Sequence, residues 1–236
     1  MGDEEQILRK GRFLREQVHK RLKDSIINGM LPPNKRLIEE KIAAEMETSR
    51  TPVREAIQKL EKEGLIHKLP RGGYAISVAT MEDIEDVFGL RSVIEGYAAY
   101  LATLRATDAD IKVLEEIVVK EEKCLREKDY DEIIELNTEF HEKLYKAAKS
   151  SKLYAMIYDL RDFIHRFRVM ILRHHDFVEI SIKDHKDMIA LMKAGHAARV
   201  EKLVRKHITR GKNLLKKRIK RGSMKYGTDQ KGSTGR

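Results

Sequence analysis

Ser49-Arg50-Thr51-Pro52-Val53-Arg54-Glu55 is the most informative stretch of the sequence, and it leads into an apolar run ending at Gly64-Leu65. Serine and threonine cap helices, proline suits the first helical turn, and Glu55 is placed to reach back to the cap, so a helix is predicted to start here. An apolar stripe for packing follows at Ala56, Ile57, Leu60 and Leu65. Arg50 and Arg54 project together from the other face, at the helix end that meets base edges and phosphates in DNA-recognition helices. A solvated helix start with two surface arginines is the alternative interpretation.

Two further helices and a hairpin surround this stretch. Helical patterns cover residues 14–28 and 37–46, and a three-residue turn, Glu47-Thr48-Ser49, separates the second from the arginine-bearing helix. Two helices across so short a turn make a helix-turn-helix. Two β-rich runs then flank Pro70-Arg71-Gly72-Gly73, which predicts a hairpin with a basic tip over residues 65–78. The whole predicts a winged helix, in which we expect Arg71, with Gly72 and Gly73, to approach the DNA backbone or minor groove, since glycine permits close approach.

Three motifs in this region resemble the GntR family of bacterial transcription regulators. They are Met30-Leu31-Pro32-Pro33-Asn34-Lys35-Arg36-Leu37, the stretch from Ser49 to Ala56, and Leu60-Glu61-Lys62-Glu63-Gly64-Leu65. The resemblance covers about the first third of the chain. It implies contacts with palindromic operator DNA from Ser49, Arg50, Thr51 and Arg54, assisted by Arg71 and Gly72 of the wing. One departure is Glu39-Glu40-Lys41 on the second helix, where some members carry a basic residue.

The composition agrees with a DNA-binding protein of two domains. The chain has 236 residues and a net charge of +10, with the basic excess at its two ends, which favours a polyanionic partner. A single cysteine, Cys124, excludes an internal disulfide. No apolar run is long enough to span a membrane and there is no signal-peptide pattern, so we expect a cytoplasmic protein without membrane contact. We expect domains at residues 1–79 and 80–221, followed by a basic disordered tail at 222–236.

From Thr80 onward the pattern is helical throughout. Helices are predicted at 80–104, 107–127, 130–148, 151–172, 179–194 and 196–220. Thr107 and Asp110 have the spacing of a helix cap. Because the connections are short, neighbouring helices are expected to pack antiparallel as a bundle. The predicted fold class is therefore mainly α, with an N-terminal winged helix-turn-helix and a C-terminal antiparallel all-α bundle.

Four polar residues fall on bundle-helix faces that the core should occupy: Asn137, His141, His185 and His207. His185 lies ten residues before the turn at Gly195 and His207 twelve after it, which places them within about 3 Å of the same height in a helical hairpin. Three inward histidines and an amide oxygen supply a nitrogen and oxygen ligand set for a divalent transition metal. The alternative is a metal-free polar pocket of hydrogen-bonded core histidines.

The helical region resembles the FCD ligand-binding domain of FadR-type GntR regulators, over roughly residues 80–215. The resemblance rests on Leu90-Arg91-Ser92-Val93-Ile94-Glu95, on Asn137-x-x-Phe140-His141, and on His185 and His207. In that family an aspartate and three histidines bind the metal, and they match positions 137, 141, 185 and 207. Asn137 stands at the aspartate position, which removes one negative charge from the ligand set. Among divalent transition metals we expect zinc or nickel.

The resemblance also implies a small organic acid as effector and a homodimer as the functional unit. Arg91, in the family-like motif, and Arg161, expected level with His141, are the candidate carboxylate anchors. Surface or interhelical ion pairs are their alternative role. A repressor that senses the metal alone is the alternative function. A metal-dependent hydrolase would need a general base, and Glu139 and Glu142 do not share the inward face, so we expect no enzyme.

Overall fold

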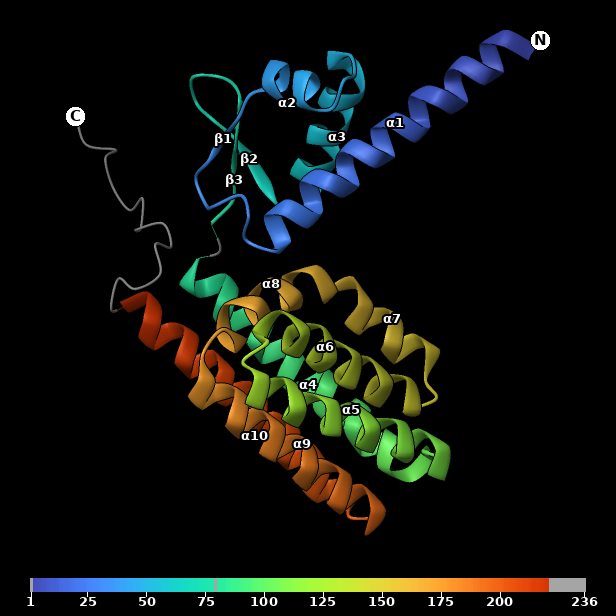
Figure 1. Cartoon of the computed structure of the whole chain (residues 1–236), viewed down its shortest axis with the longest axis vertical. Coiled ribbons are helices and arrows are strands. Elements are labelled where there is room, and N and C mark those ends of the chain that lie inside the picture. The colour runs from blue at the N-terminus through green and yellow to red at the C-terminus, as the bar shows by residue number, and fades with distance from the viewer. Residues whose placement is uncertain (1, 79, 221–236) are drawn as a thin grey trace. The chain divides into compact units, whose positions relative to one another are not determined.

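The computed structural model describes residues 2–78 and 80–220, and the tail expected at 222–236 lies outside these ranges. Within them, ten helices and one three-stranded sheet form two compact units that divide at Thr80 (Figure 1). The prediction of a mainly α protein with a winged helix-turn-helix and a helical bundle is confirmed. In the same ranges, no helix is long and apolar enough to cross a membrane.

The first unit combines three helices with a small antiparallel sheet. Its elements are α1 (Gly2–Ile27), β1 (Arg36–Leu37), α2 (Glu39–Glu45), α3 (Arg50–Lys62), β2 (Ile66–Lys68) and β3 (Tyr74–Ile76). The strands lie in the order β1-β3-β2. α3 packs against α1, and the apolar stripe predicted on α3 is buried in this core together with Val18, Leu22 and Ile26 of α1.

Two helices of this unit start at residues other than those predicted. α1 begins at Gly2 rather than at residue 14, since no proline interrupts the residues before it. α2 begins at Glu39 rather than at residue 37, because Arg36 and Leu37 pair with Ala75 and Tyr74 of β3 as an added strand. The buried side chain of Leu37 thus reaches the core from a strand.

The second unit consists of helices alone. They are α4 (Met81–Arg105), α5 (Asp108–Glu127), α6 (Tyr130–Ala147), α7 (Ser151–Asp159), α8 (Arg161–Leu172), α9 (His175–Lys193) and α10 (Ala197–Lys220). α10 packs along α4, and α5 packs on both α6 and α9. Thr107 and Asp110 form the expected capping box at the start of α5. α9 begins four residues earlier than predicted, because Phe177 and Val178 in its first turn are buried.

The helix predicted over residues 151–172 is instead two helices, α7 and α8, separated at Leu160. The Leu160 amide bonds to the Ile157 carbonyl at 3.1 Å, which is a tighter turn than that of an α-helix. The Arg161 guanidinium donates to the Tyr158 carbonyl at 2.9 Å and so satisfies a backbone group at the break.

Candidate functional site

The candidate DNA-contact surface lies at the N-terminal turn of α3. Ser49, Arg50, Thr51 and Arg54 are exposed there, on the face opposite the buried stripe. The expected cap is not formed: Ser49 occupies the N-cap position, but its side chain makes no cap hydrogen bond. The third residue of the helix is Pro52, which has no N–H to offer. Glu55 does not reach back to the cap, and its carboxylate lies 3.8 Å from Nη1 of Arg15 on α1.

The tip of the wing is exposed and closed by backbone hydrogen bonds. The Leu69 amide donates to the Gly73 carbonyl at 2.9 Å, and Gly72 donates to Leu69 at 3.0 Å. Gly72 and Gly73 have φ angles of 83° and 85°, which only glycine adopts without strain. Arg71 is exposed beside them, and Nη2 of Arg36 donates to the Gly72 carbonyl at 3.3 Å. The wing therefore presents basic side chains around a tip with little steric bulk.

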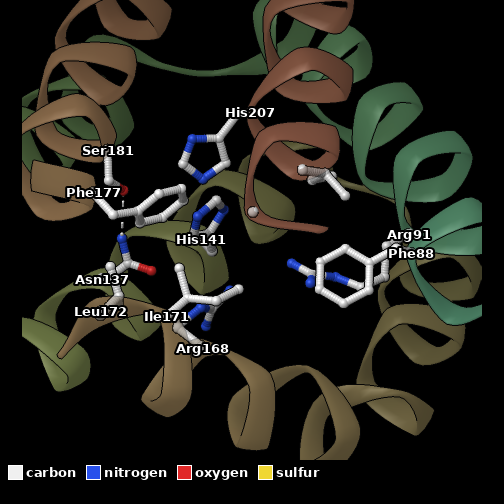
Figure 2. Close-up of a pocket in the computed structure, with 12 residues that line it drawn as sticks. Phe88, Arg91, Asn137, His141, Arg168, Ile171, Leu172, Phe177, Ser181 and His207 are labelled. Carbon is white, nitrogen blue, oxygen red and sulfur yellow. Dashed lines mark hydrogen bonds between the residues drawn. The ribbon is translucent and has the colours of Figure 1, made fainter. Parts of the chain in front are cut away.

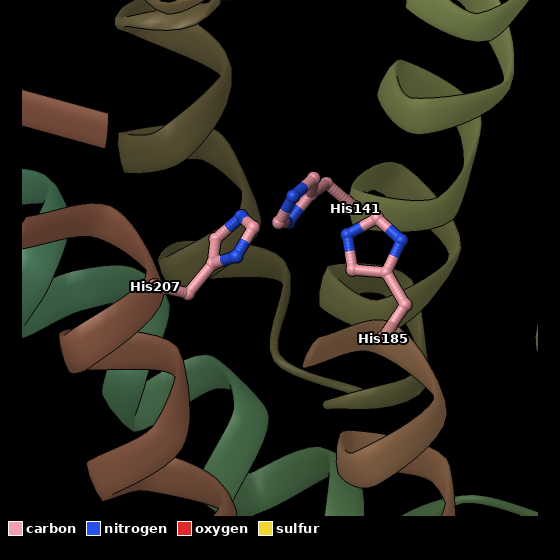
Figure 3. Close-up of side chains that lie close together, drawn as sticks. All are labelled: His141, His185 and His207. Carbon is pink, nitrogen blue, oxygen red and sulfur yellow. The ribbon is translucent and has the colours of Figure 1, made fainter. Parts of the chain in front are cut away.

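In the second unit, the structure brings the three predicted histidines together. His141 comes from α6, His185 from α9 and His207 from α10, and their rings point toward one another (Figure 3). All three are buried, and the centroids of their rings lie 5.2 to 5.5 Å apart. One ring nitrogen from each lies within 4.8 Å of the others. This spacing suits three ligands of a single metal ion.

Two of these histidines have a buried carboxylate behind them. Oε2 of Glu121 lies 2.9 Å from Nδ1 of His185, and Oδ2 of Asp184 lies 3.0 Å from Nδ1 of His207. A carboxylate accepts the Nδ1 proton, which leaves the lone pair on Nε2. In metalloproteins this arrangement orients the ring and makes Nε2 a stronger ligand. Sequence patterns did not single out Glu121 or Asp184.

A tyrosine takes the same place behind the third histidine. The Tyr145 hydroxyl lies 3.1 Å from Nδ1 of His141 and donates to the carboxylate of Glu95. Because the hydroxyl gives its own proton to Glu95, it accepts the Nδ1 proton of His141. Nε of Arg91 donates to the other oxygen of Glu95 at 2.6 Å. A buried series of hydrogen bonds from Arg91 through Glu95 and Tyr145 to His141 therefore fixes the orientation of this imidazole too.

The buried setting favours the neutral forms of His141, His207 and Tyr145. Burial lowers the pKa of His141 well below its usual value, and the nearby charge of Arg168 adds to the effect. Burial also lowers the pKa of His207, although the hydrogen bond to Asp184 opposes it. Burial, and then the charge of Glu95, raises the pKa of Tyr145 well above its usual value. Neutral imidazole is the form of histidine that binds metal.

Asn137 lies beside the histidines, as expected. Its Nδ2 atom is 3.5 Å from Nε2 of His185 and 3.2 Å from the Ser181 hydroxyl, and its carbonyl oxygen points away from Ser181 (Figure 2). The ring of Phe140 stacks on His185 with centroids 3.8 Å apart and an interplanar angle of 11°. The predicted four-residue set is therefore one cluster, with the plane of His185 held by an aromatic ring.

A cavity opens beside the cluster (Figure 2). Its polar lining consists of Arg91, Asn137, His141, Arg168, Ser181 and His207, and the remaining lining is largely apolar. Water-sized molecules can occupy about 30 Å³ of it. Burial lowers the pKa of Arg168, but a guanidinium stays charged in proteins. The cavity thus combines neutral metal-type ligands with two fixed positive charges.

Of the two arginines expected to bind the effector, Arg91 lines this cavity and Arg161 does not. Arg161 is exposed, its guanidinium lies 3.7 Å from the centroid of the Tyr158 ring, and it donates to the Tyr158 carbonyl. The expectation assumed one continuous helix over 151–172, and the break at Leu160 removes that geometry. The role of a second cavity arginine falls to Arg168, two turns further along α8.

The sequence did contain a signal for Arg168. It lies four residues after Ile164 and four before Leu172, both of which are buried, so it shares the inward face of α8. An arginine on an apolar face is the same type of signal that identified the three histidines.

Comparison with known proteins assigns both units. Residues 14–76 match the bacterial regulatory proteins of the gntR family, and residues 86–210 match the FCD domain. The HTH-type transcriptional regulator YdhC of Bacillus subtilis (strain 168) is 32% identical over 65% of this chain and 69% of its own. The HTH-type transcriptional repressor RspR of Escherichia coli (strain K12) is 27% identical over 67% of this chain and 70% of its own.

Solved structures agree on the fold. E. coli McbR/YncC has a TM-score of 0.72 at 22% identity and covers 87% of this chain and 98% of its own. The FCD match spans more than half of the chain, and it follows the gntR match in the order in which the two units occur. The chain therefore belongs to the GntR family, as a DNA-binding transcriptional regulator with an FCD effector-binding domain.

Proposed function

We propose that this regulator binds a small carboxylate together with a divalent transition metal beside His141, His185 and His207, and that this binding controls its affinity for operator DNA. The shared orientation of the three imidazoles carries the proposal. Each has its Nδ1 atom occupied by a buried partner, so each keeps Nε2 for a common centre. Core histidines that only satisfy their own hydrogen bonds have no need to converge in this way.

The donor set fits Zn²⁺ or Ni²⁺ better than Mg²⁺ or Ca²⁺. Imidazole nitrogen suits the transition metals, whereas the two hard cations select oxygen ligands. Asn137, whose side chain lies beside Nε2 of His185, would complete the set through its carbonyl oxygen. A bound ion would supply a Lewis acid that holds a carboxylate oxygen of the effector. All four protein ligands are neutral, so the positive charge of the ion remains available to that carboxylate.

Two arginines favour an anionic effector. Arg91 and Arg168 line the cavity from α4 and α8 (Figure 2). The bond from Nε of Arg91 to Glu95 holds that guanidinium in place and leaves its remaining N–H groups for a ligand. A fixed planar guanidinium binds a carboxylate through two parallel hydrogen bonds.

The size of the cavity favours a second candidate, a repressor that senses the metal alone. A volume of about 30 Å³ admits roughly two water molecules. An organic acid therefore requires lining side chains to move, whereas an ion with water ligands requires less movement. The two candidates differ in whether metal is sufficient to change operator binding.

For the output of the regulator, we propose that the end of α3 and the wing contact operator DNA. The contact residues are Ser49, Arg50, Thr51, Arg54, Arg71 and Gly72, all of which are exposed. Arginines at this end of the helix can read guanine, while glycines at the wing tip allow close approach to the DNA backbone.

An exposed apolar face on α4 supports a homodimer. Leu90, Val93, Tyr97 and Leu104 are each between 50% and 59% exposed. Leu90, Tyr97 and Leu104 recur every seven residues with Val93 between them, which is the pattern of paired helices. α10 and α6 pack against α4, and a helix that is apolar on both faces is stable when both are covered. We expect a second copy of the chain to cover the outer face.

Light scattering tests the dimer. Tyr97→Glu places a charge in the middle of the apolar face and should give monomers. Val119→Glu is the matched control, because Val119 is 64% exposed on α5 and lies outside the α4 pattern. A dimeric Tyr97→Glu protein would contradict the proposed face.

Metal analysis and an operator titration test the metal and effector proposals together. The probe is a duplex selected from a random library with the native protein. Affinity is measured after chelation, with Zn²⁺ or Ni²⁺ alone, with members of a panel of hydroxy acids and sugar acids alone, and with both. The proposal expects a change in affinity only when both are present. A change with metal alone supports the metal sensor, and a protein that binds no metal contradicts both.

A further inference from the structure

Two glutamates of α2 hold the two arginines of the candidate recognition helix. Nε and Nη2 of Arg54 donate to Oε2 of Glu39 at 3.2 Å and 3.0 Å, and Nε also lies 3.3 Å from Oε1. Nη1 of Arg50 donates to Oε1 of Glu40 at 2.8 Å, and its Nη2 lies 3.6 Å from Glu39. The acidic pair that departs from some family members is thus in contact with the residues expected to read DNA.

The two glutamates differ in their surroundings. The side chain of Glu39 is 19% exposed, while that of Glu40 is 71% exposed. The hydrogen bond from Arg54 lowers the pKa of Glu39, so this carboxylate stays ionised. Arg54 meets Glu39 through two of its nitrogens, whereas Arg50 meets Glu40 through one. The first pair is a two-point contact to a half-buried carboxylate, and the second is a one-point contact to a solvated carboxylate, while the two arginines are equally exposed.

We propose that Glu39 is a positioning residue that aims Arg54 at a base edge, and that Glu40 competes with DNA for Arg50. The inference rests on the proposed contact of both arginines with operator DNA. Glu39 occupies the Nε–H and one N–H of Nη2 in Arg54. Three of the five guanidinium N–H groups remain, on Nη1 and Nη2. That is the pair of nitrogens that binds O6 and N7 of guanine.

Positioning of this type raises specificity rather than general affinity. A guanidinium held before binding loses less rotamer freedom when it meets its base. Because its orientation is fixed, it can also form both hydrogen bonds only with a base that presents two acceptors in that direction. Nonspecific contacts with phosphates place no such demand on direction, so they do not need Glu39.

Glu40 acts in the opposite direction. An exposed ion pair is weak, and Arg50 leaves it readily. Once Arg50 turns to the DNA, the free carboxylate of Glu40 lies on the same surface as the phosphates and is repelled by them. Loss of this charge should therefore strengthen binding to any duplex.

Glu39→Gln and Glu40→Gln form a matched pair for the test, because each removes one negative charge from the first turn of α2. The probes are a duplex selected from a random library and a scrambled duplex of the same composition. For Glu40→Gln we expect affinity for both to rise about threefold, with their ratio unchanged. For Glu39→Gln we expect a similar rise on scrambled DNA and a fall of about tenfold in the ratio. The scrambled duplex also reports folding, since an unfolded variant loses both affinities.

Arg54→Ala separates failure of this inference from failure of the proposed function. If Arg54→Ala keeps the specificity ratio, the proposed base contact of Arg54 is wrong and the inference fails with it. If Arg54→Ala loses the ratio while Glu39→Gln keeps it, only the positioning role is overturned. When Glu39→Gln is combined with Arg54→Ala, it should have no further effect on the ratio of selected to scrambled DNA affinity. A persistent effect there would show that Glu39 acts through another group and would overturn the inference.

Discussion

Asn137→Asp should make the metal-free protein less stable and the metal-bound protein more stable. Asn137 is 3% exposed, 3.2 Å from the Ser181 hydroxyl and 3.5 Å from Nε2 of His185. Aspartate keeps the shape of the side chain and replaces a neutral amide with a carboxylate. Without metal, the carboxylate is buried away from water, and the Ser181 hydroxyl can give it only one hydrogen bond in return. With metal it becomes a charged ligand.

The two effects can be estimated from this geometry. A buried carboxylate with a single donor should lower the free energy of unfolding by about 2 kcal/mol. At about 3 °C per kcal/mol, the melting temperature falls by about 6 °C. One negative charge about 4 Å from a dication gains about 8 kcal/mol at an effective dielectric constant of 20, and desolvation removes most of it. A net gain of about 2 kcal/mol tightens the metal Kd by about thirtyfold.

Melting curves and calorimetric titrations of Zn²⁺ or Ni²⁺ provide the assay. The transition that moves on adding metal belongs to the helical unit, so its midpoint is compared with and without chelator for both proteins. The expected result is a crossing, in which the variant melts lower without metal and higher with it. Equal metal affinities for the two proteins would refute the placement of residue 137 among the ligands.

One change of pH and two substitutions test separate parts of the structure. Lowering the pH from 7 to 5.5 should destabilise the metal-free protein in urea titrations. Burial lowers the folded-state pKa of His141 and His207, so in this pH range the unfolded chain binds more protons than the folded chain. The unfolding free energy therefore falls by at most about 1.2 kcal/mol for each histidine. Phe140→Leu removes the ring stacked on His185 and should lower the unfolding free energy by about 1 kcal/mol while weakening zinc binding in calorimetry. Arg50→Ala should weaken operator binding by about 1–3 kcal/mol in a gel-shift titration, and unchanged binding would exclude Arg50 as a base reader.

The winged helix could be predicted because its signals are local. The spacing of Ala56, Ile57 and Leu60, the short turn before α3 and the glycines of the wing each specify structure within a few residues. The inward histidines were found in the same way, because each shares a helix face with apolar residues. Leu37 shows the limit of this reasoning. Its apolar side chain fitted a helix face equally well, and only pairing with the distant Tyr74 makes it a strand residue.

The groups that support the site could not be found by such reasoning. Glu95, Glu121 and Asp184 are buried, yet in a chain with 36% charged residues they resemble the many glutamates and aspartates of solvated helix faces. Each contacts a side chain on another helix, and a pattern of neighbouring residues cannot predict a contact between residues so far apart in the sequence. The break at Leu160 has no glycine or proline to mark it, which is why Arg161 was expected in the cavity.

The charges around the cavity indicate how metal and acid should interact. Among the residues whose burial is described, the buried carboxylates are Glu95, Glu121 and Asp184. Each already has a buried partner, which is Arg91, His185 and His207 respectively. Glu121 and Asp184 lie on the Nδ1 side of their histidines, away from the Nε2 atoms proposed to bind the ion, and although Oε1 of Glu121 has no hydrogen-bond partner among the described residues, none of the four proposed ligands is anionic. An ion at this site keeps its full positive charge, and an acid bound at its open position supplies the missing negative charge.

Metal and acid should consequently bind with positive cooperativity. By thermodynamic linkage, each raises the affinity for the other by the same factor, which for direct contact between opposite charges we expect to exceed about ten. Zinc titrations with and without saturating acid, and acid titrations with and without zinc, should give equal ratios of Kd values. Acids that bind zinc in free solution must be corrected for with a protein-free titration. A ratio near one would mean that the acid binds away from the metal, and the cavity arginines would then have to bind it without the ion.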